Sequence, residues 1–354
     1  MAVVGAGITG CSAAHTLAEA GLRVRVHEQR RVAEGASGRN GGFALRGGAM
    51  SYVHACEWLG DEAARSYWEL TERYLRRLGE LAGDAFRPVG SLRVAADQAE
   101  REELRAEHEA LREHDFAAEW REPLQPPLDR RFPAGIFHPT DAAVQPARMT
   151  RRLAERASSA GAEFVEQHRV ASVGELEAER VLVATDGYPS GLLGDLEGLI
   201  IPTRGQMIAS EPVDERLFPF PHYGRHGFDY WQQLEDGRIT AGGFRDVDLS
   251  SEFTAEEEIT PLIQGSLEDF LADLIGRRLE VTHRWAGIFG LVLDFMPVVG
   301  PVPGSAGGVW VCGGYSGHGN VLAFMCGDLV ARAMLDDPDP VLGLFDPARL
   351  LAAA

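Results

Sequence analysis

The sequence contains little cysteine, and no part of it is long and apolar enough to cross a membrane. Its four cysteines, Cys11, Cys56, Cys312 and Cys326, are scattered and form no C-x-x-C pair. This spacing argues against a disulfide framework and against a zinc site, so no metal is expected. No apolar run approaches the roughly 20 residues of a transmembrane helix, so no membrane partner is expected. No signal peptide precedes the first expected strand, and the predicted location is the cytoplasm.

Positive charge is also scarce, because 53 acidic residues outnumber 34 basic ones and the formal net charge is −19. Nucleic acids bind to basic patches, so a nucleic-acid partner is not expected. The acidic excess can attract a cationic substrate, although it more simply keeps a protein in solution. The 354 residues suit two domains better than one. The oligomeric state is left open, and so is any extension of the natural chain before Met1.

The N-terminal glycine motif lies between a short apolar strand and a helix, expected at residues 2–4 and 8–20. Its three glycines, Gly5, Gly7 and Gly10, form a G-x-G-x-x-G turn. Such a turn brings a pyrophosphate close to the main chain and to the positive end of the helix dipole. Packing alone could also explain these glycines, but the surrounding strand and helix favour dinucleotide binding.

An acidic residue completes this pattern. Glu28 follows a second expected strand at residues 22–27. Its carboxylate can accept hydrogen bonds from ribose hydroxyls and would repel a 2′-phosphate. Strand, turn, helix, second strand and acid together predict a Rossmann-type nucleotide site.

A second glycine-rich loop follows at residues 34–43, with the sequence EGASGRNGGF. Its glycines let the backbone run against a planar ligand. Ser37 and Arg39 can reach phosphates, Arg39 through the fork of its guanidinium group. A disordered loop is the alternative, but the position just after Glu28 favours a ligand contact.

Two later strands end in small or glycine-rich segments. The strand at 180–184 ends in turn residues, at the edge where ligands gather in open α/β sheets. The strand at 309–312 enters GGYSGHGN, and a helix is expected at 321–335. The N–H groups of that helix would face the pyrimidine edge of a flavin and stabilise its anionic reduced form. A turn without chemistry is the alternative, and His318 taken alone is more typical of a structural histidine.

The remaining expected elements separate these motifs. They are helices at 61–82, 97–120, 146–161 and 256–274, strands at 86–95 and 163–173, and a hairpin at 230–243. The fold class predicted from this order is α/β (mixed α+β), a discontinuous Rossmann-like FAD-binding domain with an inserted antiparallel-sheet substrate domain. The FAD-binding domain is expected at 1–83, 138–202 and 286–354, and the substrate domain at 84–137 and 203–285.

The motifs GAGITG, GASGRNGG, VLVATDGY, IPTRGQ, PVVGPVPG and GGYSGHGN occur in this order along the whole chain. In this the chain resembles the D-amino-acid oxidase superfamily of FAD-dependent oxidoreductases, and GASGRNGG is most similar to the γ-glutamylputrescine oxidase group. The resemblance implies FAD as cofactor, with Val170 meeting the adenine through its backbone. The residues expected to contact FAD are Gly5, Ala6, Gly7, Ile8, Thr9, Gly10, Glu28, Gln29, Ala36, Ser37, Arg39, Asn40, Gly41, Gly42, Val170, Ala184, Thr185, Gly187, Gly314, Ser316, Gly317, His318, Gly319 and Asn320.

The sequence departs from the family at the substrate carboxylate. Glycine and D-amino-acid oxidases carry an arginine that clamps this group, and the matching position here is Phe289. A carboxylate without a fork-shaped partner binds poorly. Simple α-amino acids are therefore less expected, unless Arg204, Arg225 or Arg245 supplies the charge. Arg204 is equally consistent with a structural role.

A second departure concerns attachment of the flavin. Monomeric sarcosine oxidase binds its flavin through a cysteine in the same region, and none lies between Trp285 and Pro297 here. Asn320 also stands in place of the lysine that follows S-G-H-G in that enzyme. We therefore expect non-covalent FAD, with Cys312 packed within its strand.

The expected reaction is oxidation of the C–N bond of a primary or secondary amine, or of an N-substituted amino acid, to an imine. A hydride would pass to flavin N5, and dioxygen is the expected acceptor, yielding hydrogen peroxide. The expected catalytic residues are Arg245, Tyr315 and His318. The expected substrate-binding residues are Phe43, Tyr230, Trp231, Trp285 and Phe289.

Two other functions stay open on the sequence. One is a dehydrogenase that passes electrons to a quinone or a carrier protein, and the other is a flavin-binding protein without turnover. A plain NAD-dependent dehydrogenase would leave the segment GGYSGHGN unexplained.

Overall fold

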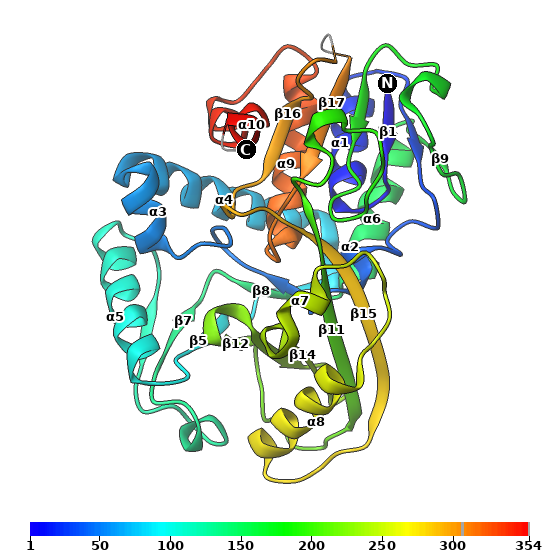
Figure 1. Ribbon diagram of the computed structural model, residues 1–354. Coiled ribbons are helices and arrows are strands. Elements are labelled where there is room, and N and C mark those ends of the chain that lie inside the picture. Colours follow the sequence, from blue (N-terminus) through cyan, green and yellow to red (C-terminus); the bar gives the residue numbers. More distant parts are fainter. Residues whose placement is uncertain (306–307, 353–354) are drawn as a thin grey trace.

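Two large sheets form the molecule, a six-stranded sheet in the upper part of Figure 1 and an eight-stranded sheet in the lower part. The computed structural model describes residues 1–305 and 308–352. In spatial order the strands of the upper sheet are β16 (Val298–Pro301), β17 (Val309–Gly313), β10 (Val181–Val183), β1 (Ala2–Val4), β2 (Arg25–His27) and β9 (Glu163–Val165).

The upper sheet is parallel apart from the pairing of β16 with β17. Its central strands are continuous apolar runs, as expected of strands that are buried on both faces. The helix α1 (Ile8–Glu19) packs against α6 (Pro146–Ser159) and α9 (Gly319–Ala333). Because β1 lies between β2 and β10, the strand order reverses at β1, and such a point binds ligands at the carboxyl ends of the strands.

The lower sheet is antiparallel except where β12 pairs with β5. Its strands, in spatial order, are β15 (Val281–Leu291), β11 (Ile201–Pro212), β14 (Arg238–Gly243), β13 (Asp229–Gln233), β12 (His222–Gly224), β5 (Ser91–Val94), β7 (Gly135–His138) and β6 (Glu119–Arg121). The helix α8 (Pro261–Ile275) covers one face, where Leu267 and Phe270 join Trp231 in a separate apolar core.

Smaller elements connect the two sheets. A three-stranded sheet consists of β3 (Phe43–Ala44), β8 (Ala142–Val144) and β4 (Phe86–Arg87). The other helices are α2 (Ala36–Arg39), α3 (Tyr52–Leu59), α4 (Asp61–Ala82), α5 (Gln98–Glu113), α7 (Leu249–Glu252) and α10 (Ala348–Ala352).

The predicted combination of a discontinuous parallel sheet with an inserted antiparallel sheet is confirmed. The helix at 61–82 has the predicted bounds, and the hairpin at 230–243 is formed by β13 and β14. The domain boundaries themselves stay a prediction, because β11 and β15 run from one sheet region to the other (Figure 1).

Two predicted helices were too long. The helix expected at 97–120 ends at Glu113, and residues 119–121 instead form the edge strand β6. The helix expected at 256–274 begins only at Pro261, because proline occupies the first helical position and disfavours helix in the residue before it.

Two predicted strands were also wrong in extent. The strand expected at 86–95 is broken at Gly90, so that β4 and β5 belong to different sheets. The strand expected at 163–173 ends at Val165, two residues before Gln167 adopts a positive φ of 56°. Local turns override the strand propensity in both segments.

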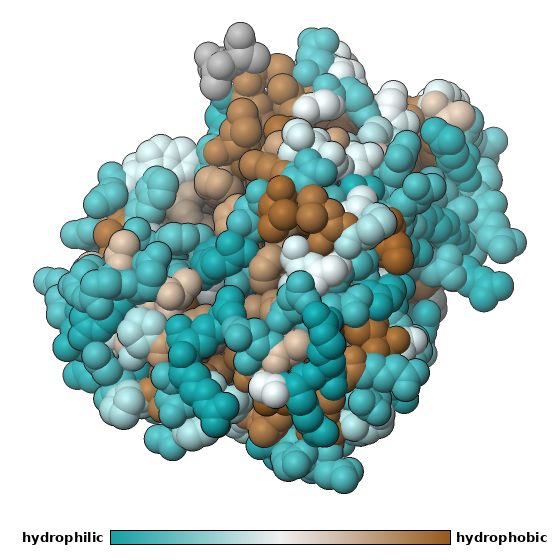
Figure 2. Space-filling view, turned by 60° about the horizontal axis from the view of Figure 1, so that its bottom comes forward, coloured by the Kyte–Doolittle hydropathy of each residue, from teal (hydrophilic) through white to brown (hydrophobic). Residues whose placement is uncertain are grey.

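On the face shown in Figure 2, hydrophilic side chains cover most of the surface and apolar side chains show between them. Several large exposed apolar residues fall within one segment of the chain, Val247, Leu249, Phe253, Ile259 and Leu262, and others lie at Trp58, Leu293 and Phe295. Among the described residues, no helix is long and apolar enough to cross a membrane. The cytoplasmic location stays a prediction.

Candidate active site

A long cavity follows the carboxyl ends of the parallel strands and continues to the lower sheet. The residues just after β1, β2 and β10 line one end, among them Gly5, Glu28 and Ala184. Residues of the lower sheet, including Tyr230 and Phe289, line the other end. The cavity therefore passes through the point where the strand order reverses, as expected for a dinucleotide site.

Close packing explains the glycines of the first turn. A Cβ at Gly10 would lie 1.9 Å from the carbonyl oxygen of Gly5. A Cβ at Gly7 would lie 2.8 Å from Ser37 Oγ, which accepts a 2.9 Å hydrogen bond from the backbone N–H of Ile8. The second glycine-rich loop is thus attached directly to the N-terminus of α1.

Glu28 supports the same turn. Its carboxylate accepts hydrogen bonds of 2.8 Å from the backbone N–H groups of Ala6 and Arg30. Each carboxylate oxygen has further lone pairs, so Glu28 can also accept ribose hydroxyls. The ribose contact stays a prediction.

Tyr315 joins the C-terminal loop to the first turn. Its hydroxyl shares a 2.7 Å hydrogen bond with Thr9 Oγ1 and also contacts Cys312 Sγ at 3.4 Å. Burial raises the pKa of Tyr315 well above its ordinary value, and the nearby Cys312 raises it further. The phenol therefore stays protonated at neutral pH, which suits a positioning role better than proton exchange.

His318 lies at the start of α9 and faces the cavity. Burial lowers the pKa of His318 to about 4, with Arg93 and Arg245 also disfavouring its charged form. The imidazole is therefore neutral at pH 7. Its Nδ1 atom is buried and has no hydrogen-bond partner within residues 1–305 and 308–352. Such an unpaired atom is costly unless a ligand satisfies it.

Aromatic rings surround the far end of the cavity. Phe43 stands edge-on to Tyr230 and to Tyr223, with ring centroids 6.0 Å and 6.4 Å away. Tyr223 and Tyr230 lie opposite each other on β12 and β13. Phe289 also lines this end, beside Arg245.

The three arginines proposed for a carboxylate differ in their partners. Arg204 is buried in an ion pair with Glu252, and its structural role is confirmed. Arg225 pairs with Asp229 and Asp246. Arg245 lines the cavity and forms no ion pair with any carboxylate of the described residues.

Aromatic rings border Arg245 instead of carboxylates. Its guanidinium carbon lies 4.3 Å from the ring centre of Phe228 and 5.7 Å from that of Phe289. Burial lowers the pKa of Arg245, but an arginine remains protonated at neutral pH. Arg245 is thus a partly desolvated cation at the cavity, with Asp246 acting on it electrostatically but no carboxylate of the described residues in an ion pair with it.

Most residues predicted to contact FAD line this one cavity. They are Gly5, Ala6, Gly7, Ile8, Thr9, Glu28, Gln29, Ala36, Ser37, Arg39, Asn40, Gly41, Val170, Ala184, Thr185, Ser316, Gly317, His318, Gly319 and Asn320. Four predicted contacts, Gly10, Gly42, Gly187 and Gly314, do not line it and instead allow neighbouring segments to approach closely. A Cβ at Gly187, for example, would lie 2.4 Å from the backbone of Phe289.

Of the predicted substrate residues, Phe43, Tyr230 and Phe289 line the cavity, but Trp231 and Trp285 do not. Trp231 is wholly buried in the core beneath α8, because successive side chains of β13 point to opposite faces. Trp285 donates from Nε1 to the carbonyl oxygen of Arg39 at 2.8 Å, so it supports the glycine-rich loop.

Tyr223 and Asp186 are among the cavity residues that the sequence analysis did not name. Tyr223 follows a histidine in a short strand, and only its pairing with Tyr230 reveals its position. The carboxylate of Asp186 accepts hydrogen bonds from the backbone N–H groups of Gly290 and Gly314, at 2.9 Å and 2.8 Å. An acid directly after the small residues that end β10 was the available signal for Asp186.

Known proteins resemble this chain along almost its whole length. The family model for FAD dependent oxidoreductases (DAO) matches residues 1–333. Gamma-glutamylputrescine oxidoreductase of Escherichia coli is 28% identical, over 95% of this chain and 84% of its own length. Glycine oxidase of Pseudomonas aeruginosa is 28% identical, over 98% of this chain and 96% of its own. The crystal structure of glycine oxidase from Geobacillus kaustophilus has a similar fold, with a TM-score of 0.80 at 21% identity and 98% of both chains covered.

Proposed function

Because this chain belongs to the DAO family of FAD-dependent oxidoreductases, we propose that it oxidises the C–N bond of a primary or secondary amine that carries a carboxylate, such as an N-substituted amino acid. Bound FAD supplies the acceptor for a hydride at its N5 atom, with an imine as product and dioxygen as the proposed final acceptor. The chain itself supplies binding, orientation and control of charge.

The residues of the cavity fit a bound FAD. The turn at Gly7 leaves no room for a side chain, which suits close approach of a phosphate. At the other end, the unpaired Nδ1 of His318 calls for a polar ligand atom. FAD is long enough to reach both regions, and Ser37 and Arg39 line the path between them.

Arg245 carries the proposal for the substrate. It lines the cavity at its aromatic end and has no carboxylate partner among the residues that the structure describes. A desolvated cation is stable only with an anion nearby, and a guanidinium binds a carboxylate through two parallel hydrogen bonds. Arg245 on the β14 side would thereby replace the arginine that is absent at Phe289.

The groups around Arg245 suit the amine end of such a substrate. Phe43, Tyr223 and Tyr230 provide aromatic edges and faces that would contact the aliphatic part of an amine and exclude water from it. Because its pKa is lowered to about 4, His318 is neutral, and its unpaired Nδ1 can form a hydrogen bond with a polar ligand atom rather than take up a proton. Because hydride transfer needs a close and fixed approach, these rigid walls would contribute mainly by orienting the substrate.

An anaerobic screen tests the proposal. Purified enzyme is mixed with N-methyl amino acids, simple amino acids and polyamines, and loss of the visible flavin absorbance is followed. Fast bleaching by amino acids or N-substituted amino acids, but not by polyamines, is expected. Bleaching by polyamines alone would contradict a substrate that carries a carboxylate. No bleaching by any compound would favour a flavin protein without turnover.

The electron acceptor needs a separate measurement. The reduced enzyme is mixed with air-saturated buffer in a stopped-flow instrument, and the return of the flavin absorbance is timed. Rapid return is expected for an oxidase. Return over minutes would point to a dehydrogenase that uses a quinone or a carrier protein.

A further inference from the structure

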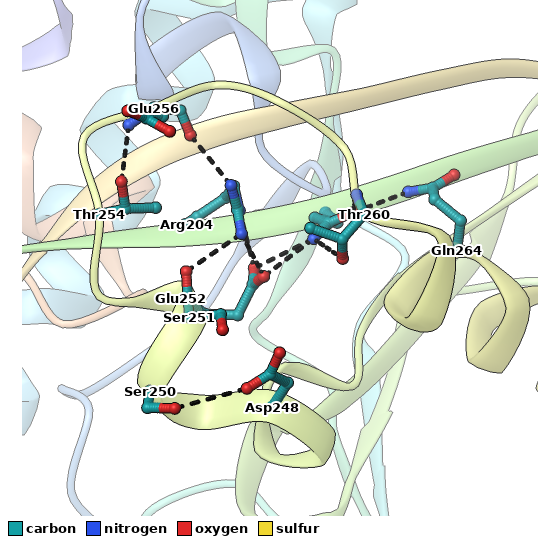
Figure 3. Close-up of polar contacts among 10 residues, drawn as sticks. Arg204, Asp248, Ser250, Ser251, Glu252, Thr254, Glu256, Thr260 and Gln264 are labelled. Carbon is teal, nitrogen blue, oxygen red and sulfur yellow. Dashed lines mark hydrogen bonds and ion pairs between the residues drawn. The ribbon is translucent and has the colours of Figure 1, made fainter.

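One surface loop is fastened at both ends to a single strand of the lower sheet. Residues 253–259, here named the strap, follow α7 and precede α8. Arg204 on β11 donates to the Glu252 carboxylate and to the carbonyl oxygens of Ser251 and Glu256, as Figure 3 shows. The start of the strap is therefore attached to a buried ion pair.

The other end of the strap is attached two residues further along β11. Gln206 accepts a 2.9 Å hydrogen bond from the backbone N–H of Thr260 and donates to its Oγ1 at 2.9 Å. Arg204 and Gln206 are both buried, and side chains two apart on a strand share one face. The two ends of the strap are thus held close together, in the manner of a compact surface loop.

Glu257 extends from the strap to the nucleotide-binding half of the molecule. Its carboxylate accepts two hydrogen bonds of 2.9 Å from Arg30 and one of 2.8 Å from Arg39. The Tyr188 hydroxyl donates a further bond of 2.6 Å. Burial, together with the Glu257 carboxylate, raises the pKa of Tyr188, so this hydroxyl keeps its proton.

Arg30, Arg39 and Tyr188 all line the FAD cavity, whereas Glu257 does not. Glu257 therefore holds three residues of the cavity wall from the side away from the cofactor. We propose that Glu257 is a positioning residue. Its hydrogen bonds, here called the clasp, hold the strap against this wall of the cavity and slow the release of FAD. The proposal rests on FAD occupying the cavity, and it is independent of which amine is oxidised.

Charge and geometry support this clasp. Without Glu257, the guanidinium groups of Arg30 and Arg39 would repel each other and lose a shared anion. Within the described part of the chain, the Arg39 side chain would then keep its hydrogen bonds to the carbonyl oxygens of Glu34 and Ala286. Glu257 is partly buried, with 21% of its side chain exposed, so this network is less screened than a surface ion pair.

The release of FAD tests the clasp without any substrate. The holoenzyme is diluted, and the return of free-flavin fluorescence gives the dissociation rate. For Glu257→Gln, which keeps the shape and removes the charge, release about tenfold faster than in the unaltered enzyme is expected. Glu258→Gln is the matched control, because Glu258 is exposed and has no side-chain partner within the described part of the chain.

Three results decide the proposal. Faster release by E257Q alone, with an apoprotein melting temperature close to that of E258Q, supports the clasp. Equal release by E257Q and the unaltered enzyme, or equal acceleration by E258Q, overturns it. Glu257→Asp keeps the charge and is expected to restore part of the slow release, which a space-filling role would not do.

Discussion

Asn40 and Asn320 are the only two asparagines of the sequence, and their side chains bind each other. Asn320 Nδ2 donates to Asn40 Oδ1 at 3.0 Å, and Asn40 Nδ2 donates to Asn320 Oδ1 at 3.2 Å. Asn320 Nδ2 also donates to the carbonyl oxygen of Phe43, and Asn40 Oδ1 accepts from the N–H of Gly42. The two glycine-rich loops at opposite ends of the chain are thereby joined along the cavity.

Removal of one amide should loosen both loops. For Asn320→Ala we expect a loss of about 1–3 kcal/mol in the free energy of unfolding, since buried partners lose their hydrogen bonds. FAD binding should weaken as well. Chemical denaturation and flavin titration measure these effects. Gln125→Ala, an exposed amide, is the control, and equal behaviour of the two variants would refute the role of the pair.

Substitution of Arg245 should affect only substrates that carry a carboxylate. For Arg245→Met we expect kcat/KM to fall about 10- to 100-fold, as for loss of a charge-assisted hydrogen bond. For the same amine with its carboxylate converted to an amide, kcat/KM should fall little. Steady-state rates for the two compounds provide the comparison, and an equal loss for both would argue against carboxylate binding.

Two helical glycines should respond to the same substitution with opposite signs. In Gly10→Ala the new Cβ would lie 1.9 Å from a backbone oxygen, and we expect a loss of stability of about 1–3 kcal/mol or more. In Gly265→Ala the Cβ meets no atom within 4 Å, so we expect a gain of about 0.5–1 kcal/mol. Thermal melting of both variants checks the difference. A neutral G10A would contradict the packing of the first turn.

The buried His222 should make the protein less stable in acid. Burial lowers the pKa of His222 from 6.5 to about 3. Between these values the unfolded chain binds a proton that the folded chain does not, so stability falls as the pH falls. At pH 5 this difference is about 2 kcal/mol.

His222→Phe removes this titration and keeps a ring against Trp231, to which His222 is stacked at 5.3 Å. We expect the variant to lose less stability than the unaltered protein between pH 7 and pH 5. Urea unfolding at both pH values measures the loss. Parallel behaviour of the two proteins would show that His222 is not kept neutral by the fold.

Local patterns were sufficient for some parts of the structure and not for others. The helix at 61–82 follows from its apolar spacing alone, since one face is buried throughout. The extra strand β6 did not follow from any local pattern, because its pairing partner β7 lies in a later segment. The helix before it ends locally, because Asp115 adopts a positive φ of 63° and the N–H of Phe116 donates to the carbonyl oxygen of Leu111.

The sequence by itself predicted the nucleotide half of the site, because its glycines, Glu28 and Ser37 belong to motifs of recognisable spacing within residues 1–43. Only the tertiary structure decided the proposed substrate half. It placed Trp231 in the core and Tyr223 at the cavity, paired Arg204 and Arg225 with carboxylates, and left Arg245 alone. The physical reason is that burial and ion pairing of a side chain depend on neighbours from distant strands. The spacing of residues along the chain does not specify these neighbours.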